Sequence, residues 1–109
     1  MSSEALLVLT TCGNAQEATR LAEVLLEHRL AACVSRLEGI VSSYRWESKI
    51  QHEEAVLVLV KTTAACYDAL EEMIRKLTSY ELPEILAVPV QGGSAEYIKW
   101  LTASVGLEE

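Results

Sequence analysis

Blocks of apolar residues with two different spacings alternate along the chain and predict strands and helices in turn. Residues 5–10, ALLVLT, form a continuous apolar run, which is typical of a strand buried on both faces. Asn14 is placed to cap the helix that follows, and Glu17 supplies the other half of a capping box. The apolar face of this helix recurs at i, i+3, i+4 and i+7: Ala18, Leu21, Ala22 and Leu25.

Residues 30–63 predict one β-hairpin that is too long for the domain that carries it. Its arms, about 32–46 and 50–62, are rich in β-branched and aromatic residues, and the polar residues 47–49 form the turn. Arms of about 13 residues at about 3.3 Å each extend roughly 43 Å. A compact chain of this length is only about 34 Å across. We therefore expect the tip to overhang and, because an isolated two-stranded ribbon is marginal in water, to be covered by a second copy of the chain.

The next stretch predicts a second helix and a further strand. Thr63 is placed to cap the helix. Its apolar stripe consists of Cys66, Leu70, Met73, Ile74 and Leu77. Pro83 pushes the residue before it toward extended backbone, so we expect this helix to end near Thr78. Residues 84–90 form the strand, which should lie at a sheet edge because Pro89 cannot donate to a ladder.

The last helix and the order of the elements define the fold class. Ser94 is placed to cap a short helix after the turn at residues 92–93. The order βαββαβ plus a C-terminal helix is α+β and ferredoxin-like, in a single domain over residues 1–109. In this topology the first and third strands are central, and residues 5–9 and 55–60 are the two most apolar runs. The second and fourth strands are edges, and they hold the polar interruptions and the proline.

Charge and hydropathy exclude several classes of partner. The chain carries 9 Lys and Arg against 16 Asp and Glu, a net charge of −7, with no basic cluster, so no nucleic-acid partner is expected. No apolar run reaches the roughly 18 residues that a membrane span needs. The first residues also lack the basic region and cleavage site of a signal peptide. We therefore expect a cytoplasmic protein without a membrane partner.

The three cysteines predict reduced thiols, because their number is odd, they lie in or beside apolar segments and no signal peptide is recognised. No pair has Cys-x-x-Cys spacing, so no structural zinc site is expected. Cys12 lies where the first strand meets the first helix, near the positive end of that helix. Such an environment lowers a thiol pKa and favours a soft metal ligand or a redox thiol. The alternative is a small residue at a tight turn. Cys33 is expected to be a small core residue.

Catalytic motifs are missing from the sequence, which contains no Gly-rich phosphate loop, His-Glu-x-x-His or nucleophile elbow, so no enzyme is expected. The adjacent acidic residues Glu53 and Glu54 point apart and are expected to be solvated. Tyr80 and Glu84 flank a proline in Tyr-x-x-Pro-Glu and should present a phenol and a carboxylate near the sheet edge. They either bind a ligand or hydrogen-bond to a neighbouring chain.

Large side chains that a small monomer cannot cover favour a subunit interface over a cofactor site. Three of them, Tyr44, Trp46 and Ile50, lie at the expected hairpin tip, and Trp100 lies on the last helix. We expect all four to contact another copy of the chain.

Five segments, in this order, resemble the signature of the CutA family, the divalent-ion-tolerance proteins: LAACV (30–34), SYRWE (43–47), VKT (60–62), YELPE (80–84) and YIKWL (97–101). The resemblance implies a ferredoxin-like homotrimer whose long hairpin reaches across to a neighbour. It also implies a cytoplasmic protein of divalent-cation tolerance, chiefly toward copper, that binds or signals and has no enzymatic activity. The shape is similar to that of the trimeric PII signalling proteins. A sensor of a small ligand in the inter-subunit clefts, or a structural trimer, are therefore the alternatives.

The resemblance does not extend to the family's metal ligands, which are replaced by other residue types at the matching positions of this chain. Copper binding in the family is associated with a cysteine on the first strand and with histidines just before the Tyr-x-x-Pro-Glu segment. The matching positions here are Thr10 for the cysteine and Leu77 and Thr78 for the histidines, and none of these is a good copper ligand. Cys12 is then the remaining candidate ligand for copper or another divalent cation.

Overall fold

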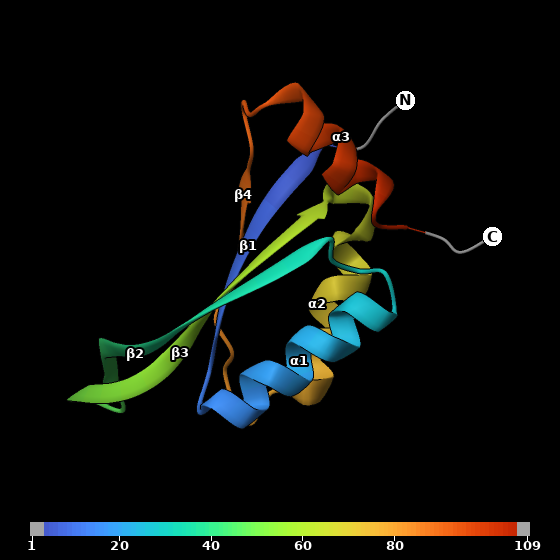
Figure 1. Cartoon of the computed structure of the whole chain (residues 1–109). Helices are drawn as coiled ribbons and strands as arrows, with labels where there is room; N and C mark the ends of the chain where they lie inside the picture. The colour runs from blue at the N-terminus through green and yellow to red at the C-terminus, as the bar shows by residue number, and fades with distance from the viewer. Residues whose placement is uncertain (1–3, 107–109) are drawn as a thin grey trace.

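The computed structural model describes residues 4–106 and contains a four-stranded antiparallel sheet in the order β2-β3-β1-β4 (Figure 1). The elements in chain order are β1 (Ala5–Cys12), α1 (Ala15–Glu27), β2 (Cys33–Trp46), β3 (Lys49–Thr63), the 3-10 turn η1 (Ala64–Cys66), α2 (Tyr67–Leu77), β4 (Ile85–Pro89) and α3 (Ala95–Ala103). The first and third strands are central and the second and fourth are edges, so the predicted ferredoxin-like fold is confirmed. Across residues 4–106, no helix is both long and apolar enough to cross a membrane.

The core lies between the sheet and helices α1 and α2, which cover one of its two faces (Figure 1). Val8, Val58 and Val60 point to this face from the two central strands and are fully buried. The predicted face of α1 is buried along its whole length: Ala18, Leu21, Ala22 and Leu25. Leu70 and Ile74 complete the layer from α2. The helical periodicities read from the sequence are therefore confirmed.

The opposite face of the sheet, here called the open face, is apolar along β1 and β4. Leu7 and Leu9 of β1 point to it and are half-buried. Leu86 and Val88, their neighbours on β4, are 57% and 46% exposed. The prediction that the first strand is buried on both faces is thus wrong for a single chain. Apolar surface of this kind is typical of a face that packs against another chain.

The β2–β3 hairpin extends well beyond the helices, as predicted (Figure 1). Its strands have 14 and 15 residues, and the longest dimension of the molecule is 46 Å, against 27 and 21 Å for the others. The turn is shorter than expected, because Lys49 pairs with Trp46 in the ladder. Glu47 and Ser48 alone form it, with φ of 50° and 70°, the left-handed pair of a type I′ turn.

A β-bulge that the sequence analysis did not predict interrupts the hairpin ladder. Leu37 pairs with Leu57, and the next pair is Ile40 with Ala55, so two residues of β2 oppose one of β3. Gly39 lies in this step with φ of 81°, a conformation that a residue with Cβ adopts at a cost. A bulge increases local twist and turns the strand beyond it. The tip therefore leaves the plane of the sheet at Gly39.

Two of the three predicted helix caps are confirmed. The side chain of Asn14 accepts a hydrogen bond from the backbone of Glu17 at 2.8 Å, and that of Ser94 accepts from Tyr97 at 3.1 Å. Thr63 makes no such bond, because η1 separates it from α2. The expected end of α2 is confirmed, with extended backbone at its cap, Thr78. In the part of the sheet described, β4 pairs with β1 alone, so Pro89 lies on an edge as predicted.

The bulge makes Gly39 sensitive to substitution for a backbone reason alone. A Cβ added at Gly39 meets nothing within 4 Å, and the same is true at Gly92, whose φ is not in the left-handed region. We expect Gly39→Ala to lower the free energy of unfolding by about 1–2 kcal/mol. Gly92→Ala should change it by less than about 0.5 kcal/mol. Urea denaturation of both variants measures the difference, and equal effects would show that φ at Gly39 is not constrained.

Candidate functional site

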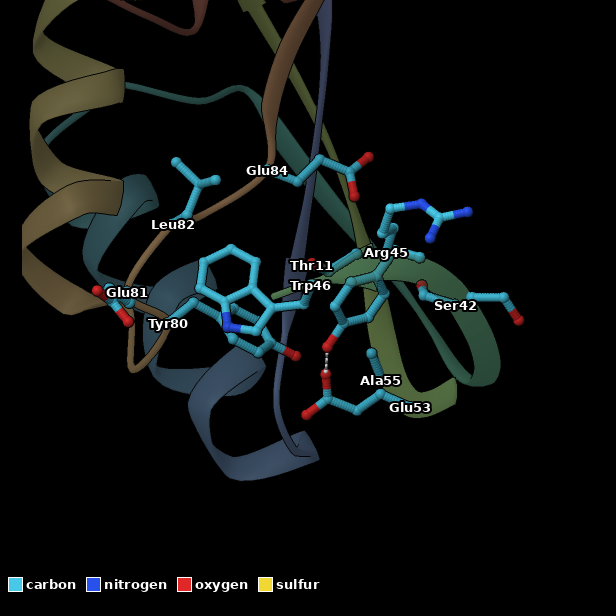
Figure 2. A pocket seen from close by; sticks show the side chains of 12 residues that line it. Thr11, Ser42, Arg45, Trp46, Glu53, Ala55, Tyr80, Glu81, Leu82 and Glu84 are labelled. Carbon is cyan, nitrogen blue, oxygen red and sulfur yellow. Dashed lines mark hydrogen bonds between the residues drawn. The ribbon is translucent and has the colours of Figure 1, made fainter. Parts of the chain in front are cut away.

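A pocket of about 720 Å³, here called the hairpin pocket, lies between the hairpin and the 80–84 segment that leads into β4 (Figure 2). It is lined by Thr11, Ser42, Ser43, Tyr44, Arg45, Trp46, Glu53, Ala55, Tyr80, Glu81, Leu82 and Glu84. The two walls belong to opposite edges of the sheet, and the central strands contribute the floor between them. The volume is within the range of small-molecule sites, about 300–1,000 Å³.

The alternation of side chains along each strand determines which hairpin residues point into the pocket. Tyr44 and Trp46 are two residues apart on β2, so they point to the same face. Glu53 faces Ser42 in the ladder and therefore shares that face. The Tyr44 hydroxyl donates a hydrogen bond to Oε1 of Glu53 at 2.7 Å (Figure 2). This hydrogen bond, followed by burial and the charge of Glu53, raises the pKa of Tyr44.

Tyr80 forms part of the opposite wall. Its backbone N–H donates to Oγ1 of Thr78 at 3.0 Å, which orders the start of the segment. Burial raises the pKa of Tyr80, and the charges of Glu53 and Glu17 raise it further. Glu53 of the hairpin is therefore close enough to the 80–84 segment for its charge to raise the pKa of the Tyr80 phenol.

Glu17 ties the 80–84 segment to the start of α1. Ser79 donates to the Glu17 carboxylate from its hydroxyl at 2.8 Å and from its backbone N–H at 3.2 Å. The backbone N–H of Gly13 donates to the same carboxylate at 3.4 Å. The predicted capping box is thus only half formed, because Glu17 bonds these groups rather than the N–H of Asn14. One carboxylate fixes both a helix end and a pocket wall.

The structure brings some of the predicted site residues together and separates others. Tyr80 and Glu84 both line the hairpin pocket, together with Tyr44 and Trp46 of the hairpin. Ile50 pairs with Arg45, the residue before Trp46, so its side chain points to the face of the ribbon opposite that of Trp46. The Ile50 side chain is 55% exposed.

Trp100 is 48% exposed on α3, far from the hairpin tip, and its ring centroid lies 5.4 Å from that of Tyr97 (Figure 1). The four expected interface residues therefore lie in two regions: α3, and the hairpin, where Ile50 is on the opposite face from Tyr44 and Trp46. Whether they contact another chain stays a prediction.

Sequence reasoning missed Glu53, Arg45 and Thr11 as pocket residues. Glu53 and Glu54 do point apart as expected, but only Glu54 lies outside the pocket lining. The signal that could have found Glu53 is the ladder register. A two-residue turn places its side chain diagonally across from Tyr44 on the same face.

The environment of Cys12 is the reverse of the predicted one. The side chain is 2% exposed, and burial together with the charge of Glu17 raises its pKa to about 11. The prediction of a lowered pKa is wrong, because desolvation of the thiolate outweighs the helix end. Cys33 is not a core residue either, since it is half-buried and its Sγ lies 3.9 Å from Nζ of Lys61.

The positions that match the family's copper ligands do not form a metal site. Thr10 is 1% exposed, and its hydroxyl has no hydrogen-bond partner among the residues that the structure describes. Thr78 accepts from Tyr80, and Leu77 is apolar and half-buried. Within residues 4–106, no group of three His, Cys, Asp or Glu side chains converges as a metal site would require. A resident metal ion therefore does not fit the described residues of a single chain.

Comparisons with known proteins agree on one family. The family model CutA1, described as divalent ion tolerance protein, matches residues 6–104. The divalent-cation tolerance protein CutA of Thermus thermophilus is 39% identical over 99 residues, 91% of this chain and 96% of that protein. Among solved structures, CutA1 from Oryza sativa has a TM-score of 0.94 at 34% identity, covering 98% of both chains. A CutA from Archaeoglobus fulgidus, described as periplasmic, has a TM-score of 0.90 at 31% identity, covering 94% and 99%.

Removing the Glu17 carboxylate should release the 80–84 segment. We expect Glu17→Ala to lower the free energy of unfolding by about 1–2 kcal/mol, because two donors of Ser79 lose a charged acceptor. The amide of Ser79 should lose its protection in hydrogen exchange followed by NMR. Glu23→Ala, an exposed position on the same helix, is the control. An unchanged hydrogen-exchange rate at the Ser79 amide would show that Glu17 does not hold this segment.

The raised pKa of Cys12 predicts how any copper(I) binding there depends on pH. Because the metal must displace the thiol proton, affinity should be weak at pH 7 and rise about tenfold per pH unit toward a pKa of about 11. Titration under reducing conditions at pH 7, 8 and 9 measures this. Cys12→Ser should abolish the pH-dependent binding and Cys33→Ser should not. Binding that survives Cys12→Ser would exclude this residue as the ligand.

Proposed function

The chain belongs to the CutA1 divalent ion tolerance family, and we propose that it acts in the response to divalent metal ions by binding or signalling rather than by catalysis. The observation that carries this proposal is the match of the CutA1 divalent ion tolerance model over residues 6–104. The candidate binding surface is the hairpin pocket, whose polar groups include carboxylates, hydroxyls and one guanidinium. One nucleophile–base pair touches it, Ser43 Oγ with Nδ1 of His52 at 2.8 Å. Both residues are exposed, and no carboxylate orients His52 among the described residues, which argues against a catalytic role.

Copper, or another divalent cation, is the ion to which we propose that the protein responds. The descriptions of its relatives name a divalent cation. A cytoplasmic location is proposed as well and is supported by the three free cysteines.

A homotrimer is the proposed assembly. The hairpin extends past the helices and therefore needs support from another chain. The open face leaves Leu86 and Val88 exposed, and the hairpin leaves Tyr44, Trp46 and Ile50 exposed. Both edge strands keep one side unpaired within the sheet described. A threefold arrangement of copies would cover these surfaces together.

The second candidate function is that of a sensor for a small ligand in the clefts between subunits. The observation that favours it is the size of the hairpin pocket, about 720 Å³, far more than a bare ion needs. Its wall on the hairpin side is also the surface expected to meet a neighbouring chain.

Light scattering is expected to give three times the 12.0 kDa chain mass at micromolar concentration. Trp46→Ala should remove an interface anchor worth about 2–4 kcal/mol per site and lower the melting temperature. The exposed change Glu72→Ala on α2 is the control and should leave the melting temperature nearly unchanged. A clean monomer would refute the proposed assembly, and equal shifts would place Trp46 outside the interface.

A further inference from the structure

We infer that the hairpin pocket binds an organic cation, a protonated amine or a quaternary ammonium, rather than a bare metal ion. The inference rests on the proposed function only in taking this pocket as the binding site. It names the chemical class of the ligand, which the family membership does not supply.

The charge of the lining is the first argument. The lining contains three carboxylates, Glu53, Glu81 and Glu84, against one guanidinium, that of Arg45. Glu53 raises the pKa of two phenols of the lining: that of Tyr44 chiefly through the hydrogen bond between them, and that of Tyr80 through its charge, after the larger effect of burial. A pocket with negative potential attracts cations and raises their local concentration.

The spacing of the carboxylates is the second argument. Glu53 lies on the hairpin, whereas Glu81 and Glu84 lie on the segment across the pocket (Figure 2). Within residues 4–106, these carboxylates do not form a group that could hold a metal ion. A dehydrated metal ion needs several oxygens within about 2.0–2.6 Å. Carboxylates on facing walls of a 720 Å³ pocket suit a larger cation that reaches both.

Aromatic surface is the third argument. In the single chain Trp46 is 37% exposed and Tyr44 40% exposed, and with Tyr80 they line the same pocket with three aromatic rings. Binding there requires that the proposed assembly leave these ring faces open toward the pocket while it covers the rest of the hairpin. Ring faces attract ammonium groups, most strongly when the ring is indole, and rings next to carboxylates form the usual cage for quaternary ammonium. Carboxylates alone would suit an inorganic ion equally well, so the rings are what select an organic cation.

The two indoles of the chain allow binding to be located directly. In the full-length 15N-labelled protein, the Trp46 indole N–H resonance should shift on titration with choline or with spermidine and should saturate. The Trp100 indole, on α3 outside the pocket lining, is the internal control and should not shift. Choline reports a quaternary ammonium and spermidine a protonated amine. The neutral isostere of choline, 3,3-dimethyl-1-butanol, tests whether charge is needed.

Charge-removing variants on one strand give a matched comparison. Glu53→Gln should weaken binding of the cation by about fivefold, whereas Glu54→Gln, on the other face of the same strand, should not change it. Arg45→Gln should strengthen binding, because it removes the positive charge of the lining. Light scattering on each variant verifies that the assembly is unchanged.

Three results would overturn the inference: no saturable shift with either cation, an equal shift with the neutral isostere, or equal effects of Glu53→Gln and Glu54→Gln. Titration with Cu(II) and Zn(II) then shows whether only the ligand class is wrong or whether the pocket is not the binding site at all. Saturable metal shifts at Trp46 without cation shifts would mean that the pocket is a site for metal, so that only the ligand class is wrong. No shift at Trp46 with any of these probes would mean that the pocket is not the binding site.

Discussion

The antiparallel pairing of β2 with β3 is the interaction on which the rest of the structure depends. Near Val58 and Val60 this ladder is part of the sheet and lies under α1 and α2. Beyond the bulge at Gly39 the same ladder continues past the helices and is held by cross-strand bonds such as that of Tyr44 to Glu53. A ribbon of that kind is marginal in water. The length of the hairpin is therefore the reason for proposing a partner chain, and the hairpin also forms one wall of the pocket.

The second wall depends on a different set of constraints. The 80–84 segment has no regular secondary structure, so its position is determined by what holds its start and its end. Glu17 and Thr78 hold the start through Ser79 and Tyr80. The end continues into β4, which pairs with β1. Edges of the sheet that are far apart in strand order thus face each other across the floor of the pocket.

The sequence was sufficient for the elements whose signal is local. Helix faces, the caps at Asn14 and Ser94 and the edge position of Pro89 all follow from spacing and side-chain chemistry, and each is confirmed. The overhang was predictable from strand length alone. The bulge was not, because Gly39 shows its role only once the pairing partners are known.

The site was less predictable for the same reason. Tyr80, Glu84, Tyr44 and Trp46 stand out by residue type, whereas Glu53 becomes a pocket residue only through the ladder register. The pKa of Cys12 was predicted with the wrong sign, because a helix end is visible in the sequence and the burial that outweighs it is not.

The central claim is that the overhanging part of the hairpin is the element that joins copies of the chain. A variant lacking residues 43–46 and 49–52 tests it most directly, because Glu47 and Ser48 then join Ser42 to Glu53 with the alternation of faces preserved. Light scattering measures its mass, and circular dichroism verifies that the core under α1 and α2 is folded. The account predicts a folded chain with the mass of a monomer or a weak, concentration-dependent oligomer. A folded variant that keeps the full oligomeric mass at the lowest measurable concentration would contradict it.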